Sequence, residues 1–397
     1  MLAAKGLTWQ DLAGTVPTGG ASRSPAVRSG LEQRSRLVTP SEPPELVTVL
    51  GPVPESLADP DTEQLLEEIT RMPEVGVDEP AAPKMRADLT GHAWLDARGR
   101  RPITALTARD VEQTASNHDH TDEVKTVVFS PDGRFLASGD EDDIVRVWDR
   151  GTGAALVLTD HTDWVNGLAF DPESELLASV SDDETVRLWL PASGSTRSVT
   201  LAGHTDWVDA AAYSAHGLLA TGGDDKTVRL WNGRDGDAIG KLPFVTDVNA
   251  VAFSPDGNRL VVATDDSIVM IALPDIEVEG TVDESAEALA FSPDGFLFAA
   301  GDSDGTVRIW ETDSGQAHHV LERKNEVSCL AFNPKGDLLA VGSGAGTNVH
   351  LYRVSDGYRL AKLDHDGEFV NSLAFSPDGT MLVTGTDEHS LVVWQVG

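Results

Sequence analysis

The chain has 397 residues, a formal net charge of −35 and a single cysteine, Cys329. A negative charge of this size repels phosphate backbones and anionic lipid headgroups, so we expect no nucleic-acid partner and no membrane partner. The lone thiol cannot form an intramolecular disulfide and is typical of a reducing compartment, which predicts a cytoplasmic protein.

Residues 1–101 are predicted to be a mostly extended leader. Pro, Gly, Ser and Thr are frequent between residues 14 and 60 and aromatic residues are few, so this stretch cannot bury enough surface to order itself. Residues 1–40 have the composition of a flexible basic arm, and more weakly that of an organelle transit peptide. We expect the basic arm, whose arginines could occupy an acidic surface of the same chain until a partner displaces them.

A short amphipathic helix is predicted over residues 61–72. Its apolar residues fall on one helical face, and Pro73 ends the run; they are Leu65, Leu66, Ile69 and Met72. This pattern is consistent with a helix docked on the outside of the following domain, and also with a helix presented to a groove of a partner protein.

A phrase close to FSPDG recurs seven times, each time about nineteen residues before a Trp or another bulky residue. The bulky residues are spaced 39 to 42 residues apart: Trp148, Trp189, Trp231, Ile271, Trp310, Tyr352 and Trp394. A period near forty residues predicts an array of similar units, each of which buries its faces against its neighbours.

Each repeat contains three short runs rich in Val, Leu, Phe and Trp, separated by turn residues. In the turn Ser130-Pro-Asp-Gly133 and its equivalents, Pro presets φ and Gly accepts a positive φ, so these turns join the first and second strands. An acidic turn joins the second and third strands, and a fourth strand follows each Trp. The pattern therefore predicts all-β repeats of four strands.

These residues resemble a WD40 repeat, most clearly in His204-Thr-Asp-Trp, Leu219-Ala-Thr-Gly-Gly-Asp-Asp and Thr227-Val-Arg-Leu-Trp-Asn232. Trp148-Asp149 supplies the dipeptide after which the family is named. The resemblance covers roughly residues 118–397 and implies a seven-bladed β-propeller. The Ala-, Asp- and Gly-rich composition is similar to that of bacterial members of the family.

The resemblance also implies a buried, hydrogen-bonded network of His, Ser or Thr, Asp and Trp within a blade. The matching positions are His120, Ser138, Asp142 and Trp148 in blade one, His161, Ser179, Asp183 and Trp189 in blade two, and His204, Thr221, Asp225 and Trp231 in blade three. Ser, His and Asp could also form a catalytic triad, but a triad is built once whereas this set recurs, so we interpret it as structural. Blades four to six lack members of the set and are expected to be held mainly by packing.

Only three residues follow Trp394, so the last repeat cannot supply its own fourth strand. An open sheet edge would leave backbone groups unpaired. We therefore expect a strand from residues 102–116 to close the ring, with the propeller extending over residues 102–397.

A candidate docking surface follows from the residue that precedes the apolar start of each first strand. This position holds Trp164 and Trp207 in adjacent blades and Phe369 two blades from Trp164, and acidic residues are predicted around them: Glu123, Asp182, Asp209, Asp224 and Asp387. Exposed Trp is frequent at binding hot spots, and acids around it favour Lys or Arg in a ligand. The competing interpretation is that both Trp side chains fold over neighbouring loops.

Two functions fit this sequence. The first is a non-catalytic scaffold or adaptor, which binds a basic or aromatic segment of a protein partner, alone or within a larger assembly. The second is a propeller enzyme, such as a metal-dependent hydrolase that uses inward-facing acids in the central channel. No nucleotide-binding, metal-binding or catalytic motif is recognised in the sequence, so the first function is preferred and no cofactor is expected.

Overall fold

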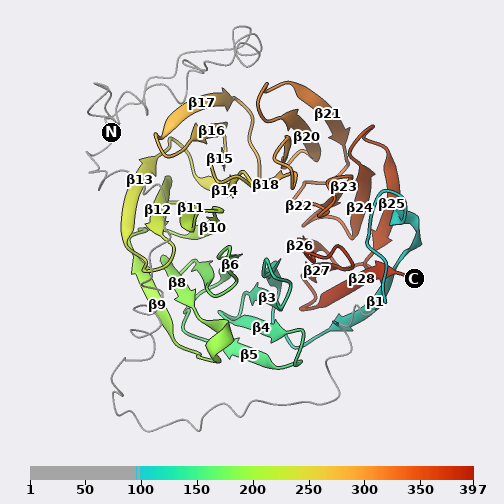
Figure 1. Cartoon of the computed structure of the whole chain (residues 1–397), viewed down its shortest axis with the longest axis horizontal. Coiled ribbons are helices and arrows are strands. Elements are labelled where there is room, and N and C mark those ends of the chain that lie inside the picture. Colours follow the sequence, from blue (N-terminus) through green and yellow to red (C-terminus); the bar gives the residue numbers. More distant parts are fainter. Residues whose placement is uncertain (1–94, 96–98) are drawn as a thin grey trace.

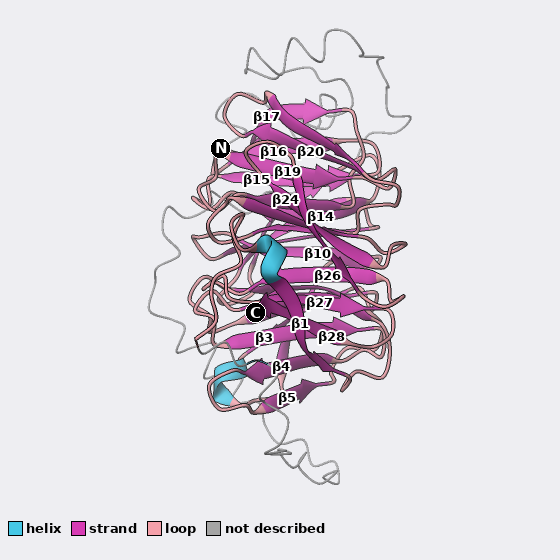
Figure 2. Ribbon diagram, turned by 90° about the vertical axis from the view of Figure 1, so that its right-hand side faces the viewer, coloured by secondary structure: helices cyan, strands magenta, loops and turns pink. Residues whose placement is uncertain are grey.

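The computed structural model describes residue 95 and residues 99–397, which form a ring of seven four-stranded antiparallel sheets around a central channel (Figures 1 and 2). The seven-bladed, all-β propeller predicted from the repeats is confirmed. The predicted basic arm and the predicted helix over residues 61–72 lie outside the described residues.

The first strand of each blade lies next to the channel and the fourth lies at the outside (Figure 1). Blades one to three consist of β2 (Val124–Phe129), β3 (Phe135–Asp140), β4 (Val145–Asp149) and β5 (Ala155–Leu158); β6 (Val165–Phe170), β7 (Leu177–Ser181), β8 (Thr185–Trp189) and β9 (Ser198–Ala202); and β10 (Val208–Tyr213), β11 (Leu218–Gly223), β12 (Thr227–Asn232) and β13 (Ala238–Pro243).

Blades four to six consist of β14 (Val248–Phe253), β15 (Arg259–Thr264), β16 (Ile268–Ala272) and β17 (Glu277–Val282); β18 (Ala288–Phe291), β19 (Leu297–Gly301), β20 (Thr306–Glu311) and β21 (Ala317–Glu322); and β22 (Cys329–Phe332), β23 (Leu338–Gly342), β24 (Asn348–Arg353) and β25 (Arg359–Asp364). Two short 3-10 helices, η4 (Ala108–Asp110) and η5 (Pro191–Ser193), complete the regular elements of the described residues. None of the helices in this part of the chain is long and apolar enough to cross a membrane.

Blade seven combines the two ends of the described chain. Its first three strands are β26 (Val370–Phe375), β27 (Leu382–Thr386) and β28 (Leu391–Val396), and its outer strand is β1 (Val111–Asn117). β1 pairs with β28 in antiparallel register from Val111 opposite Val396 to Asn117 opposite Leu391. The strand that closes the ring thus comes from the segment before blade one.

Residues 102–110, which the expected closing segment included, are not part of this strand. They turn across the ends of blades six and seven, where Ile103 is fully buried and its backbone N–H donates to Gly379 O at 2.7 Å. Asn333 Nδ2 donates to the carbonyl of Ile103 at 3.0 Å. Leu95, which the predicted boundary placed in the leader, is buried in the core beside Trp148.

The blades contact one another through apolar residues that lie at the start of the inner strand or, in blades five and six, two residues before it. All seven are fully buried: Val124, Val165, Val208, Val248, Ala286, Val327 and Val370. A glycine in the second strand of the preceding blade makes room for several of them; a Cβ placed on Gly222 would lie 2.4 Å from Val248 Cγ1. In five blades the residue that follows this position lies at a β-bulge of the inner strand, and in all seven blades this residue is polar.

Candidate functional site

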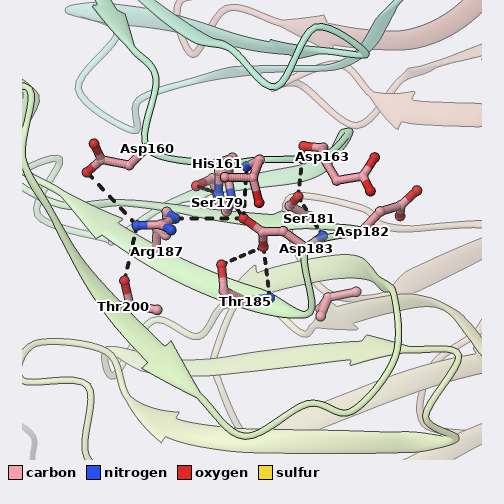
Figure 3. Close-up of polar contacts among 12 residues, drawn as sticks. Asp160, His161, Asp163, Ser179, Ser181, Asp182, Asp183, Thr185, Arg187 and Thr200 are labelled. Carbon is pink, nitrogen blue, oxygen red and sulfur yellow. Dashed lines mark hydrogen bonds and ion pairs between the residues drawn. The ribbon is translucent and has the colours of Figure 1, made fainter.

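The polar network of blade two is complete. His161 lies 2.8 Å from Asp183 Oδ2 through Nδ1 and 2.7 Å from Ser179 Oγ through Nε2 (Figure 3). Trp189 Nε1 donates to the same hydroxyl at 2.8 Å. Burial alone would raise the pKa of Asp183, but hydrogen bonds from His161 and Thr185 prevail and hold it below the usual range. The buried polar atoms of the His161, Ser179 and Trp189 side chains are thereby all paired, which is the requirement for a stabilising network.

Blade three repeats this arrangement. His204 Nε2 lies 2.8 Å from Thr221 Oγ1, which also accepts from Trp231 Nε1 at 2.9 Å. His204 Nδ1 lies 3.1 Å from Asp225 Oδ2 but is not aligned for a hydrogen bond. Burial is the main reason that the pKa of His204 is lowered, so the ring is neutral at pH 7.

Blade one requires a correction, because the carboxylate on its histidine belongs to Asp140 and not to Asp142. His120 Nδ1 lies 2.7 Å from Asp140 Oδ2, Nε2 lies 2.6 Å from Ser138 Oγ, and the ring meets Trp148 edge-on. Asp140 is the last residue of β3 and is fully buried, whereas Asp142 is exposed in the following turn. Asp142 has the same spacing to the Trp as Asp183, and two acids in one turn cannot be distinguished by that spacing.

These networks lie inside the blades and bind the sheet together, so the surface available to a ligand is elsewhere. The channel wall carries one such surface. A polar residue follows each buried apolar position, on the inner strand or just before it: Lys125, Asn166, Asp209, Asn249, Glu287, Ser328 and Asn371. Some of them join neighbouring blades, as Asn166 Nδ2 donates to Val208 O at 3.3 Å and Ser328 Oγ donates to Val370 O at 2.9 Å.

A cavity of about 570 Å³ opens at one end of this channel. We refer to it as the channel-mouth cavity; it is lined by Lys125, Trp164, Asn166, Asp182, Trp207, Asp209, Glu287, Ser303, Glu326, Val327 and Ser328. Four of the predicted binding residues, Trp164, Trp207, Asp182 and Asp209, are brought together there. The opposite wall comes from blades five and six.

Trp164 and Trp207 are half-exposed, at 42% and 51% of their surfaces. Their backbones are fixed, because Asp182 N–H donates to Trp164 O at 3.1 Å and Asp224 N–H donates to Trp207 O at 3.0 Å. Lys125 Nζ lies 5.1 Å from the ring centroid of Trp164 and 2.9 Å from Glu141 Oε1. The Trp164 ring therefore already accepts a cation from the same chain, and most of the Trp207 side chain is open to solvent.

The carboxylates at this cavity repel one another. Burial, followed by the charges of Asp224 and Asp182, raises the pKa of Asp209 to about 8. Burial also raises the pKa of Asp182 and of Glu287, in each case with a further contribution from neighbouring acids. The Asn166 amide bridges two of these groups, donating to Asp182 Oδ1 at 2.6 Å and lying 3.4 Å from Asp209 Oδ1. A cation entering the cavity would relieve this repulsion.

The other predicted binding residues do not line the cavity. Phe369 is 40% exposed on blade seven, where its backbone N–H donates to Asp387 Oδ1 at 2.6 Å. Burial, together with Glu141, raises the pKa of Glu123 in blade one. Asp224 lies beside Asp209 and contributes to its raised pKa without lining the cavity itself.

Sequence reasoning missed the channel-facing half of the cavity, Lys125, Asn166, Glu287 and Ser328. The available signal was the position directly after each buried apolar residue, which is polar in all seven repeats. Among the described residues, no group of three or more His, Cys, Asp or Glu side chains is arranged to hold a metal ion.

Comparison with known proteins gives the family. A profile described as WD domain, G-beta repeat matches residues 111–149, 155–189, 195–232, 243–271, 315–353 and 357–395. The chain belongs to the WD40-repeat family. Its first matched segment begins with β1 and ends with β4, so one sequence repeat contributes the outer strand of one blade and three strands of the next. A profile of the anaphase-promoting complex subunit 4 WD40 domain matches residues 275–333, which include blade five.

Relatives of this WD40 protein include the small ribosomal subunit protein RACK1 of Neurospora crassa, which is 32% identical over 288 residues, 70% of this chain and 80% of that protein. WD repeat and HMG-box DNA-binding protein 1 of Xenopus laevis is 32% identical over 183 residues, 41% of this chain and 16% of that protein. Transducin beta-like protein 3 of Bos taurus is 32% identical over 161 residues, 38% of this chain and 20% of that protein.

The chain therefore spans only a small part of the last two relatives. The relatives named here come from eukaryotes, so the expected similarity to bacterial members finds no support among them.

Proposed function

We propose that this WD40 propeller is a non-catalytic scaffold or adaptor subunit, and that its channel-mouth cavity captures a partner segment carrying Lys or Arg next to an aromatic residue. One observation carries the proposal. Two half-exposed Trp side chains on adjacent blades border a cavity whose carboxylates repel one another, as the raised pKa of Asp209 indicates. Trp and Arg dominate the energetics of protein interfaces, and an ammonium or guanidinium over a Trp ring contributes about 0.5–2 kcal/mol.

The contact between Lys125 and Trp164 supports the cationic part of the proposal. In this contact the Trp164 ring already holds an ammonium group of the same chain, and Trp207 presents a second ring with no such cation on it among the described cation–π pairs. Asp209 and Glu287 also line the cavity, and Asp209 supplies negative charge behind the rings once a bound cation favours its ionised form. A partner's basic side chain would stack on the Trp207 ring with its charge toward Asp209.

The relatives support the general class of function. One of them is named as a protein of the small ribosomal subunit, which is a large assembly, and others are named for their WD repeats or their likeness to transducin beta. For this chain we propose a place in a larger assembly, no nucleic-acid partner and a cytoplasmic location. A non-enzymatic role is proposed on the same grounds.

The chemistry of the ligand can be tested by selecting binders from a library of random twelve-residue peptides displayed on phage, using the full chain as bait. We expect the selected peptides to be enriched in Lys or Arg beside an aromatic residue. Selection on an Asp209→Asn, Glu287→Gln variant should lose the enrichment in basic residues. Peptides that are acidic or purely aliphatic would contradict the proposal, as would the same basic enrichment on the variant.

The affinity of a selected peptide should also depend on pH. A cation favours the ionised form of Asp209, whose pKa in the free protein is about 8. Below that pH, binding must release the proton of Asp209, so affinity should rise as the pH is raised from 6 to about 8 and then level off. Calorimetry in two buffers of different ionisation enthalpy measures the released protons directly; a pH-independent affinity without proton release would contradict this prediction.

A further inference from the structure

Blade six replaces the members of the polar network that blades one to three share. Arg323 stands four residues before the buried Val, where those blades carry His, and Gly346 stands where blades two and three carry Asp183 and Asp225. Tyr352 replaces the Trp, and His350 stands at the position of Arg187 in blade two. A histidine paired with a carboxylate has thus become an arginine without one.

These substitutions surround a second cavity, of about 520 Å³, between blades five and six. We refer to it as the blade-six cavity; it is lined by Glu322, Arg323, Lys324, Asn325, Gly346, Asn348, His350, Tyr352 and Arg359. Glu322 ends β21 of blade five, and the side chain of Tyr352 packs with apolar residues of that blade. Four of its lining residues come from β24 and β25, which are the third and fourth strands of blade six and lie toward the outside of the ring (Figure 1).

Three positive groups of this cavity lack carboxylate partners. Among the described residues, no carboxylate oxygen lies within 4.0 Å of a side-chain nitrogen of Arg323, Lys324 or Arg359. The equivalent region of blade two is different, because Asp183 there contacts both His161 and Arg187, the latter at 4.0 Å (Figure 3). Uncompensated cations in a chain with a net charge of −35 indicate a site for an anion.

Arg323 is held in place by two backbone carbonyls. Its guanidinium donates to Gly342 O at 2.9 Å and to Asn348 O at 3.3 Å, while its Nε is buried without a hydrogen-bond partner. Asn348 Oδ1 is also buried without a partner, and turning this amide over would present a donor while keeping the contact with the Thr347 hydroxyl, which can donate or accept. The guanidinium of Arg323 is therefore fixed in place before any ligand arrives.

The positive charges near this cavity also affect the neighbouring residue His350. Burial, followed by the charges of Arg323, Arg359 and Lys362, lowers the pKa of His350 to about 4, so its ring is neutral at pH 7. Its Nδ1 lies 3.3 Å from the Tyr352 hydroxyl. An anion near these cations would offset their effect on His350.

We propose that the blade-six cavity binds a phosphate-type oxyanion. A phosphate dianion matches three cationic side chains better than a single carboxylate does, and guanidinium groups bind phosphate oxygens in a bidentate manner. The cavity has room for a group attached to the phosphate. A small phosphate ester and a phosphorylated side chain of a partner share this chemistry. The proposal does not depend on the function assigned to the channel-mouth cavity.

The test is a calorimetric titration of the full chain with inorganic phosphate at pH 7 and low ionic strength. Lys324 and Arg359 are exposed, so the Lys324→Gln, Arg359→Gln variant should fold and bind phosphate about tenfold more weakly, as expected when charge-assisted contacts are removed. The matched control is Lys335→Gln, Arg353→Gln, which removes the same charge from blade six at residues paired with Asp337 and Asp356. The control should bind phosphate like the unchanged protein.

The outcomes separate the sources of the ligand. A peptide with one phosphoserine that binds more tightly than inorganic phosphate, when its unphosphorylated form does not bind, assigns the site to a modified partner. Phosphate that binds at least as tightly assigns it to a small molecule. Absence of phosphate binding to the unchanged protein, or equal weakening in the variant and the control, would overturn the proposal. The pKa of His350, followed by NMR, should rise from about 4 when phosphate binds and provides a readout without substitution.

Discussion

At the residue scale, the stability of a blade depends on whether each buried polar atom finds a partner. His161 has a hydroxyl on one ring nitrogen and a carboxylate on the other. His365 of blade seven has only the hydroxyl of Thr384, at 2.8 Å, and its Nδ1 is buried without a hydrogen bond. Burial lowers the pKa of His365 to about 4. The difference between the two blades is one carboxylate.

Glu388→Asp should supply that carboxylate. Residue 388 has the same spacing to Trp394 as Asp183 has to Trp189, and Glu388 is exposed. We expect the shorter side chain to reach His365 Nδ1 and to increase the free energy of unfolding by about 1 kcal/mol, the net contribution of one hydrogen bond. Urea denaturation at pH 7 measures this gain.

The pH dependence gives a second readout for Glu388→Asp. In the unchanged protein, the folded pKa of His365 lies below the unfolded value, so the unfolded chain takes up a proton first and stability is lost as the pH falls from about 6.5 toward 4. The variant should raise the folded pKa and make this loss smaller. Equal stability at pH 7 together with an unchanged pH slope would show that the carboxylate does not reach His365.

At the scale of elements, the close approach of blades depends on glycines in the second strands. Gly222 of β11 faces Val248 of β14, and an added Cβ would lie 2.4 Å from Val248 Cγ1. Real Cβ atoms do not approach so closely, so Gly222→Ala must push blade four away from blade three. We expect a loss of about 1–3 kcal/mol, typical of overpacking, in thermal or urea denaturation.

Gly240→Ala is the matched control, because Gly240 lies in β13 of the same blade and no atom lies within 4 Å of its added Cβ. This variant should be neutral or slightly stabilising, since alanine restricts the unfolded chain more than glycine does. Equal effects of the two substitutions would mean that the loss reflects glycine's backbone freedom rather than contact between the blades.

The closing strand gives a prediction about chain length. β1 satisfies the outer edge of β28, and the segment before it contributes the buried residues Leu95 and Ile103. Removal of residues 1–117 should therefore expose the edge of β28 and lower the melting temperature of the whole propeller, whereas removal of residues 1–85 should leave it unchanged. Circular dichroism melts compare the two; equal melting temperatures would contradict the structural role of β1.

At the scale of the whole molecule, acid repulsion at the channel mouth works against the fold. The folded pKa of Asp209, about 8, lies above the unfolded value near 4, so stability decreases as the pH rises through this interval. The Asp209→Asn variant has an amide that cannot ionise, so it should be more stable than the unchanged protein. The difference in the free energy of unfolding should grow from pH 5 to about 8. Asp237→Asn, which removes the same charge from an exposed turn, should show no such growth in urea denaturation; a constant difference for both would contradict the assignment.

The repeat period was sufficient to predict seven blades, because the turn phrase and the bulky residue mark the same two places in every unit. It could not place individual polar contacts where a turn offers more than one candidate, as with Asp140 and Asp142. Part of the channel-mouth cavity could be predicted, because the spacing within adjacent repeats places Trp164 and Trp207 side by side. Glu287 and Glu326 line the same cavity only because the closed ring brings blades five and six opposite these residues. The blade-six cavity depends on the absence of a carboxylate, which is apparent only when the neighbours of Arg323 are known.

The most direct test of the central claim is the affinity of one selected basic peptide for a Trp164→Ala, Trp207→Ala variant, measured by calorimetry. The control is Phe296→Ala, Tyr358→Ala, which removes two exposed aromatic side chains that do not line the channel-mouth cavity. We predict that the Trp variant, checked for an unchanged melting temperature, loses at least about 2 kcal/mol of binding free energy, as hot-spot residues do, while the control binds normally. Unchanged affinity in the Trp variant would show that the propeller binds its partner elsewhere.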